Sequence, residues 1–281
     1  MQTNRSRQRG FTLVEMLVVL AIIAVLVGLL LPAVMAAVNA ARRGQMAMEI
    51  SQLAQAVEAY KNEFGDYPPS LDTSLNWSDA TVRANSAVER HIRKCFPKIT
   101  AQEKDDFYTK IAPKLDQGEA LVFWLSGIKK NPRQPFFGTG ETYKFYDFDT
   151  RRLIDTDDDD ILGLTGDDSD DLAVFRPSHA KDTCYIYMDA KHYGNYTAAN
   201  PAKGESLDTS VELQVRPYTQ PGGTKGVNNT TFQIICAGQD GIFSDSVASY
   251  KQFPNGANYG EADMDNITNF SDGRRLEDNL P

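Results

Sequence analysis

The sequence is poor in the residues that build disulfide frameworks and many catalytic sites. Its 281 residues include three cysteines and three histidines. The cysteines, Cys95, Cys184 and Cys236, form no C-x-x-C pair, and their odd number allows at most one internal disulfide. They are therefore too sparse for a stapled framework, and they do not indicate a redox compartment.

Common enzyme motifs and an excess of basic residues are also absent. The chain contains no G-x-S-x-G, no P-loop and no H-E-x-x-H. Its formal net charge is -9 at pH 7, whereas binding to nucleic acid requires a basic face. The sequence therefore predicts a protein that is not an enzyme and has no nucleic-acid partner.

One segment lacks charge completely. No charged residue occurs from Met16 to Ala41, a run that as a helix would span roughly 35–40 Å and cross a bilayer of about 30 Å. Residues 1–10 hold three arginines and no acid, so the positive-inside rule places this leader in the cytoplasm. The rest of the chain is then expected in the periplasm or outside the cell.

A secretory signal peptide or an uncut signal anchor would explain this hydrophobic run, but neither explains Glu15. The run is longer than the usual signal-peptide core of about 7–15 residues. An acid in an apolar helix costs about 2.5–3.5 kcal/mol at the membrane centre and usually marks a function. Cleavage after Gly10 would give Phe11 a free ammonium group. A neighbouring copy could then present its ammonium to Glu15 and fix the register between copies.

The stretch from Arg9 to Glu15, R-G-F-T-L-V-E, followed by the long apolar helix, resembles the type IV pilin and type II secretion pseudopilin superfamily. The resemblance implies that a prepilin peptidase cuts between Gly10 and Phe11 and methylates the new amine of Phe11. It also implies that Glu15 is used for assembly. Pro32 resembles the mid-helix proline of the family, where the helix kinks or unwinds.

The resemblance also implies a function, partners and a location. The function is that of a structural subunit of a type II secretion pseudopilus. Its partners are further copies of the chain, other pseudopilins, the prepilin peptidase and an inner-membrane assembly platform. The chain would cross the inner membrane once. Two alternatives remain open: a subunit of a type IV pilus-like surface filament, and a membrane-anchored binding or enzymatic head that uses pilin export.

The N-terminal helix is expected to continue beyond the membrane. Residues 11–41 form the predicted transmembrane and assembly helix, and residues 42–66 its amphipathic continuation. Apolar residues recur there at spacings of four and three, the period of one helix face: Met46, Ile50, Leu53, Val57, Tyr60 and Phe64. Gly65 and the prolines after it are expected to end the helix. The segment 59–70, AYKNEFGDYPPS, resembles the helix end of the major pseudopilin.

Residues 67–281 are predicted to form an α+β head. Helices are expected from Thr81 to Lys94 and, once or twice, within residues 102–128. Short aromatic or β-branched runs predict strands at 142–148, 183–189 and 231–237. The predicted fold is thus a long N-terminal helix packed on an antiparallel sheet, with residues 70–130 as an insertion.

An acidic run at residues 155–171 is the first of two candidate metal regions. Asp155, Asp157 and Asp159 have the D-x-D-x-D spacing of a calcium loop. However, Asp160 stands where an EF-hand needs glycine, and Gly166 stands where it needs glutamate. The run is therefore interpreted as a solvated acidic loop.

The second candidate region lies near the C-terminus. The segments 236–245, CAGQDGIFSD, and 261–270, EADMDNITNF, resemble the C-terminal calcium loop of major pseudopilins. The resemblance implies that Asp240 and one or both of Asp263 and Asp265 bind calcium, with the Ala237 carbonyl as a further ligand. An unusual stretch, residues 243–260, separates the two halves, and a turn with surface acids is the alternative. This resemblance favours a type II secretion pseudopilin over the other filament types.

Overall fold

The computed structural model describes residues 11–72, 74–154, 172–179, 183–204 and 213–281. The chain divides into two compact units, residues 1–42 and residues 43–281, which are treated separately below. The basic leader with Gly10 and the acidic run at 155–171 both lie outside the described residues.

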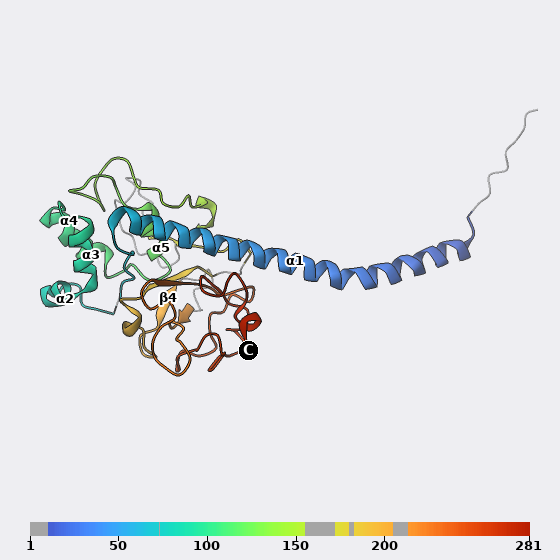
Figure 1. The fold of residues 1–281 in the computed structure, drawn as a ribbon. Helices are drawn as coiled ribbons and strands as arrows, with labels where there is room; N and C mark the ends of the chain where they lie inside the picture. Colours follow the sequence, from blue (N-terminus) through green and yellow to red (C-terminus); the bar gives the residue numbers. More distant parts are fainter. Residues whose placement is uncertain (1–10, 73, 155–171, 180–182, 205–212) are drawn as a thin grey trace, which may run out of the picture. The chain divides into compact units, whose positions relative to one another are not determined.

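Helix α1, Leu13–Phe64, is continuous (Figure 1). In the first unit its side chains up to residue 38 are exposed, and the apolar part is long enough to cross a membrane. Pro32 lies within the helix and has no N–H to donate to the carbonyl of Gly28, one turn earlier. The helix nevertheless continues through Pro32 without unwinding. A kink at this residue stays a prediction.

In the second unit, α1 is amphipathic as the sequence predicted. The residues of the predicted stripe are all 2% exposed or less up to Tyr60: Met46, Ile50, Leu53, Val57 and Tyr60. Phe64 is partly buried against the same core. The helix ends at Phe64 because Gly65 adopts a φ of 77°, a left-handed conformation that glycine reaches without strain.

The predicted helix from Thr81 to Lys94 is present as two helices, α2 (Ala80–Asn85) and α3 (Ala87–Cys95). Ser86 separates them, because its side chain accepts the backbone N–H of Glu89 and caps α3. Residues 102–128 were expected to hold one or two helices. They hold most of α4 (Ala101–Asp106), a π-helical turn (Phe107–Ile111) and α5 (Ala120–Ser126).

The described strands form three small antiparallel sheets, which confirms the α+β class. The largest has the order β3 (Ile186–Asp189), β6 (Phe232–Cys236) and β7 (Ile267–Thr268). The others pair β1 (Leu153–Ile154) with β2 (Val174–Phe175), and β4 (Ala202–Gly204) with β5 (Leu213–Val215). Strands β3 and β6 lie within the predicted runs at 183–189 and 231–237.

The predicted strand at 142–148 is wrong. The backbone N–H of Tyr143 donates to the carbonyl of Ile128 at 2.7 Å, and that of Phe145 to the carbonyl of Leu125 at 3.0 Å. This segment is therefore hydrogen-bonded to the end of α5 and the residues after it, and not to a sheet. Thr142 forms an isolated antiparallel bridge with Lys129, and the pairing does not extend into a strand. The rings of Tyr143 and Phe145 stack with centroids 5.6 Å apart and pack against the core, which accounts for the aromatic alternation.

The three-stranded sheet is buried on both faces. Ile234 and Cys236 of β6 belong to a core that also contains the stripe of α1. Ile235 and Ala237 belong to a second core, as the two-residue period of a strand requires. The turn after β6 therefore starts from a firmly held strand, which is where the sequence placed its candidate calcium ligands.

Candidate functional site

Glu15 lies in the first turn of α1 and caps its own helix. Its Oε2 atom accepts hydrogen bonds from the N–H and the Oγ1 of Thr12, both at 2.8 Å. Thr12 Oγ1 in turn accepts the N–H of Glu15 at 3.2 Å. This reciprocal pair is a capping box, which satisfies donors that a helix start leaves without intrahelical partners. Sequence reasoning missed Thr12, although its T-x-x-E spacing carries that signal.

Phe11 is the residue immediately before Thr12, and its side chain is 72% exposed. The structure thus places Phe11 within one helical turn of Glu15, as the sequence implied. Gly10 itself lies outside the described residues. Glu15 is the last charged residue before a run of 26 uncharged ones, from Met16 to Ala41.

Asp263, one of the expected calcium ligands, is fully buried and already has a cation. Its Oδ2 forms an ion pair with the Nζ of Lys251 and accepts the N–H of Gly260 at 2.7 Å. Its Oδ1 accepts the hydroxyl of Tyr218 at 3.2 Å. Burial raises the pKa of the Asp263 carboxyl, and Lys251 opposes that rise. Both carboxylate oxygens are therefore engaged by groups of the chain itself.

Asp265 is held by the turn that follows β6. Its Oδ2 accepts the backbone N–H of Gln239 at 2.7 Å and that of Asp240 at 3.3 Å. Its Oδ1 is buried and has no hydrogen-bond partner, and burial raises the pKa of this carboxyl. Gly238 has a φ of 65°, and a Cβ there would come within 2.4 Å of the Asp265 carboxyl group. The tight turn thus wraps its amides around one carboxylate.

The remaining expected ligands do not complete a metal site. Asp240 is exposed, and its Oδ1 accepts the N–H of Ile242 at 2.8 Å, while Ala237 is buried directly after β6. Calcium takes about six to eight oxygen ligands. Among the described residues, no three His, Cys, Asp or Glu side chains converge closely enough to hold a metal ion. The residues therefore do not fit the expected carboxylate site.

A buried cluster contains the residue types of a hydrolase triad, Ser70, Asp189 and His192. The Oδ2 of Asp189 accepts the Oγ of Ser70 at 3.0 Å and also contacts Nδ1 of His192. Burial would raise the pKa of Asp189, but His192 and two backbone amides outweigh it and lower that pKa. In a triad the histidine stands between serine and aspartate, whereas here both bond the same carboxylate. The cluster therefore ties the segment after α1 to the end of β3.

A second cluster joins the partly buried Cys95 to a buried histidine. The Sγ of Cys95 lies 3.7 Å from Nδ1 of His91, and Nε2 of His91 lies 2.9 Å from the hydroxyl of Tyr60. Burial raises the pKa of the Cys95 thiol to about 12, so the thiolate is scarce at neutral pH. A catalytic cysteine needs the opposite shift. All three cysteines are free thiols.

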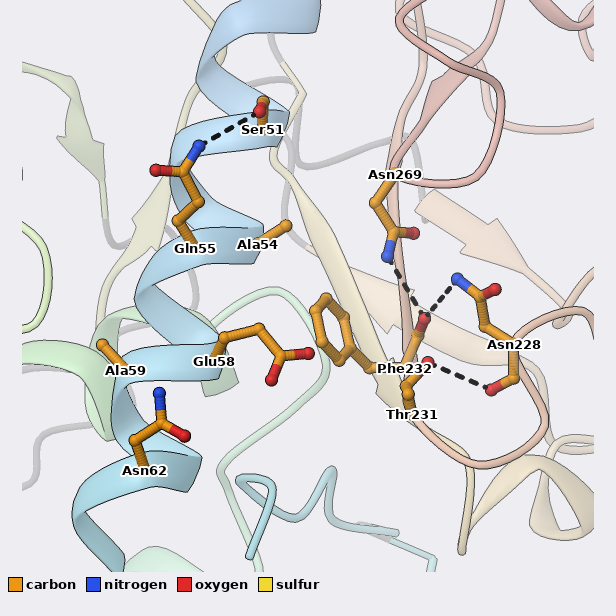
Figure 2. Close-up of a pocket in the computed structure, with 10 residues that line it drawn as sticks. All are labelled: Ser51, Ala54, Gln55, Glu58, Ala59, Asn62, Asn228, Thr231, Phe232 and Asn269. Atoms are coloured by element: carbon orange, nitrogen blue, oxygen red, sulfur yellow. Dashed lines mark hydrogen bonds between the residues drawn. The ribbon is translucent and has the colours of Figure 1, made fainter.

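A groove of about 440 Å³ runs between residues 51–62 of α1 and the loop before β6 (Figure 2). Figure 2 shows the ring of Phe232 facing the side chain of Glu58 across it. The amides of Asn228 and Asn269 both donate to the carbonyl of Phe232, at 3.2 and 3.3 Å. Glu58 is the one ionisable residue in the lining, so the groove offers no acid–base pair.

Residues 5–31 match the family model of the prokaryotic N-terminal methylation motif. The matched range contains Gly10, Phe11 and Glu15 and ends just before Pro32. No curated protein and no solved structure gives a significant match to the chain. The chain thus carries the N-terminal motif of the type IV pilin and pseudopilin superfamily, which implies processing by a prepilin peptidase and filament assembly in general.

Proposed function

We propose that this chain is a structural subunit of a type II secretion pseudopilus. It is made as a precursor, cut after Gly10, methylated on the new amine of Phe11 and assembled through its N-terminal helix. The observation that carries the proposal is Glu15 at the head of 26 uncharged residues, inside the matched motif. A plain membrane anchor has no use for an acid at that position.

The capping box suggests how one carboxylate serves both the free and the assembled subunit. In the single chain, Glu15 accepts two hydrogen bonds from Thr12, so its charge is satisfied locally. Cleavage creates an ammonium group on Phe11. In the filament, the ammonium of a neighbouring copy binds the same carboxylate, and a charged donor binds more strongly than the neutral donors of Thr12. Assembly exchanges an internal partner for an intermolecular one.

The location and partners belong to the same proposal and rest on the resemblance to the family. The chain crosses the inner membrane once, and the second unit lies in the periplasm or outside the cell. Its partners are further copies, other pseudopilins, the peptidase and the inner-membrane assembly platform. We propose that the second unit has a structural role and not an enzymatic one. Its histidine clusters connect segments of the fold and have no catalytic arrangement.

Mass spectrometry of the mature N-terminus tests the processing step. We expect a chain that begins at a methylated Phe11. Changing Gly10 to valine should leave an uncut precursor, because a branched side chain replaces glycine beside the bond to be cut. Gly28→Ala is the matched control, since a Cβ added there meets no atom within 4 Å and should not alter processing. A signal peptidase could cut instead among the small residues that end the apolar run, Ala36, Ala37, Ala40 and Ala41. A mature chain that begins near Ala37 would therefore establish a cleaved signal peptide.

Cross-linking in the membrane tests the assembly role of Glu15. Glu15→Gln should insert normally but form about tenfold fewer cross-linked pairs, because a charge-assisted hydrogen bond becomes a neutral one. Thr12→Ala is the contrasting variant. It removes the hydroxyl that donates to Glu15 within the subunit but keeps the charge pair between subunits, so cross-linked pairs should still form. Unchanged cross-linking in Glu15→Gln would favour the anchored-head alternative. If cells that carry Glu15→Gln lose surface fibres but secrete proteins normally, the surface-pilus alternative is favoured.

A further inference from the structure

The stretch 243–260 separates the two halves of the calcium-loop resemblance and brings a lysine to one of the expected ligands. We propose that Lys251 is the resident cation of this C-terminal region. Its ammonium neutralises Asp263, where the resemblance implied calcium, and the region folds without a divalent cation. This inference concerns the second unit alone, and it does not depend on how the chain assembles.

The backbone fixes Lys251 in place. Its carbonyl accepts the N–H of Thr219 at 2.8 Å, and the N–H of Phe253 donates to the carbonyl of Thr219 at 2.9 Å. Gln252, the residue between Lys251 and Phe253, forms a parallel bridge with Thr219. The lysine therefore lies on a short, strand-like segment held against a neighbouring loop. A side chain whose root is fixed in this way loses less freedom when its tip binds.

The Asp263 end of the pair is equally fixed. Gly260 and Tyr218 each donate to its carboxylate, at 2.7 and 3.2 Å. With Lys251, three segments of the chain therefore meet at this group: those of Tyr218, of Lys251 and of residues 260–263. The side chain of Asp263 is 0% exposed and that of Lys251 is 7% exposed. A buried carboxylate without a counter-ion is strongly unfavourable, and the ammonium removes that cost. A calcium ion bound to the Asp263 carboxylate would be repelled by the Lys251 ammonium that already contacts it.

The region also has apolar burial of its own. Phe243, Ala262, Ile267 and Leu276 are all 3% exposed or less. Phe270 packs on Tyr218 and on Phe253, with ring centroids 5.8 and 5.0 Å apart. At Asp263, the order that a metal was expected to supply is therefore supplied by the ion pair with Lys251 and a small aromatic core. Asp265 is held by the amides of Gln239 and Asp240, and the positive charge of Arg275 favours its ionised form.

Thermal unfolding of the full chain in detergent tests the metal-free claim. The wild type should melt at the same temperature, within about 1 °C, in EDTA and in millimolar calcium, because a cation that does not bind the folded state cannot stabilise it. A calcium-dependent rise in Tm that Asp263→Asn or Asp265→Asn removes would overturn the proposal. This arm needs no variant of Lys251 to fold.

Variants of the pair test the role of Lys251 directly. Lys251→Met should lower Tm by about 10 °C, because it leaves a buried carboxylate unpaired. The double variant Lys251→Met/Asp263→Asn should recover at least half of that loss, because no unpaired charge remains. Lys225→Met, at an exposed lysine, is the control and should change Tm by less than about 2 °C. A Lys251→Met variant that melts like this control would refute the assignment.

Discussion

Glu49 provides a polar connection between α1 and the rest of the second unit, and its neutralisation has a calculable effect on stability. The guanidinium of Arg152 grips both its carboxylate oxygens, at 2.7 and 2.8 Å. The hydroxyl of Tyr185 donates at 2.6 Å and the N–H of Ser178 at 3.3 Å. Glu49→Gln keeps the size of the side chain but replaces one acceptor oxygen by a donor that faces other donors.

The loss is set by the burial of the pair. Removing one partner of a fully buried ion pair costs about 3–5 kcal/mol, whereas an exposed pair contributes about 0–1 kcal/mol. The side chains of Glu49 and Arg152 are 15% and 21% exposed, so the pair is nearer the buried limit. With a discount for solvent screening, we expect a loss of about 2 kcal/mol and a Tm lowered by about 4–8 °C.

The effect should depend on pH with a definite sign. Burial raises the pKa of Glu49, but Arg152, Tyr185 and Ser178 outweigh it, so the folded-state pKa is lowered. A lowered pKa gives stability that is present above the unfolded value of about 4.3 and is lost as the pH falls through the folded value. The gap between wild type and Glu49→Gln should therefore be full at pH 7 and narrow below about pH 4.

The measurement can be confined to the second unit. Both tryptophans and all twelve tyrosines follow residue 42, so the tryptophan and tyrosine bands in the near-ultraviolet circular dichroism of the full chain report this unit alone. Glu58→Gln is the control on the same helix, since the ion pair of Glu58 with Lys61 is 3.9 Å long and nearly half exposed. The glutamine oxygen can still accept the hydrogen bond that Tyr67 donates to Glu58. An equal Tm shift in both variants, or a gap that does not narrow in acid, would refute the reasoning.

Two further predictions concern other sites in the second unit. Gly238→Ala should lower the free energy of unfolding by more than about 1 kcal/mol in urea titrations, because φ is 65° and the new Cβ would strike Asp265; an unchanged midpoint would contradict this. Cys95 should resist iodoacetamide at pH 8, because a pKa of about 12 leaves roughly one thiol in ten thousand ionised; rapid labelling seen by mass spectrometry would contradict the burial.

Local patterns in the sequence predicted the elements whose signals are themselves local. The helical period from Met46 to Phe64 located the buried stripe of α1, and Gly65 located its end. The aromatic alternation at 142–148 was misleading, because an extended segment alternates its side chains whether or not it joins a sheet. The S-x-x-E pattern at Ser86 and Glu89 was a readable helix start, and it explains the break between α2 and α3.

The metal region shows where local patterns stop being informative. The spacing of Asp263 and Asp265 resembles a calcium loop, but the partner of Asp263 is a lysine twelve residues earlier. Nothing at the position of Lys251 distinguishes it in sequence from an exposed lysine. Its role depends on Thr219, which holds its backbone from a third segment. Such pairings are set by the packing of distant segments, so the spacing of acids alone could not reveal them.

The sequence alone singled out Glu15, because placing an acid in lipid costs free energy. The structure adds the hydrogen bonds from Thr12 that offset this free-energy cost. An acid costs about 2.5–3.5 kcal/mol at the membrane centre and less near its edge, where the first turn of α1 is expected to lie. A side chain that caps a helix start contributes about 0.5–2 kcal/mol, a comparable amount. The free subunit can therefore keep Glu15 in the membrane without a partner. Relief of a penalty then cannot drive assembly, and the drive must come from the added attraction of the neighbour's ammonium. This is why neutralising Glu15 should spare insertion and weaken only the contact between subunits.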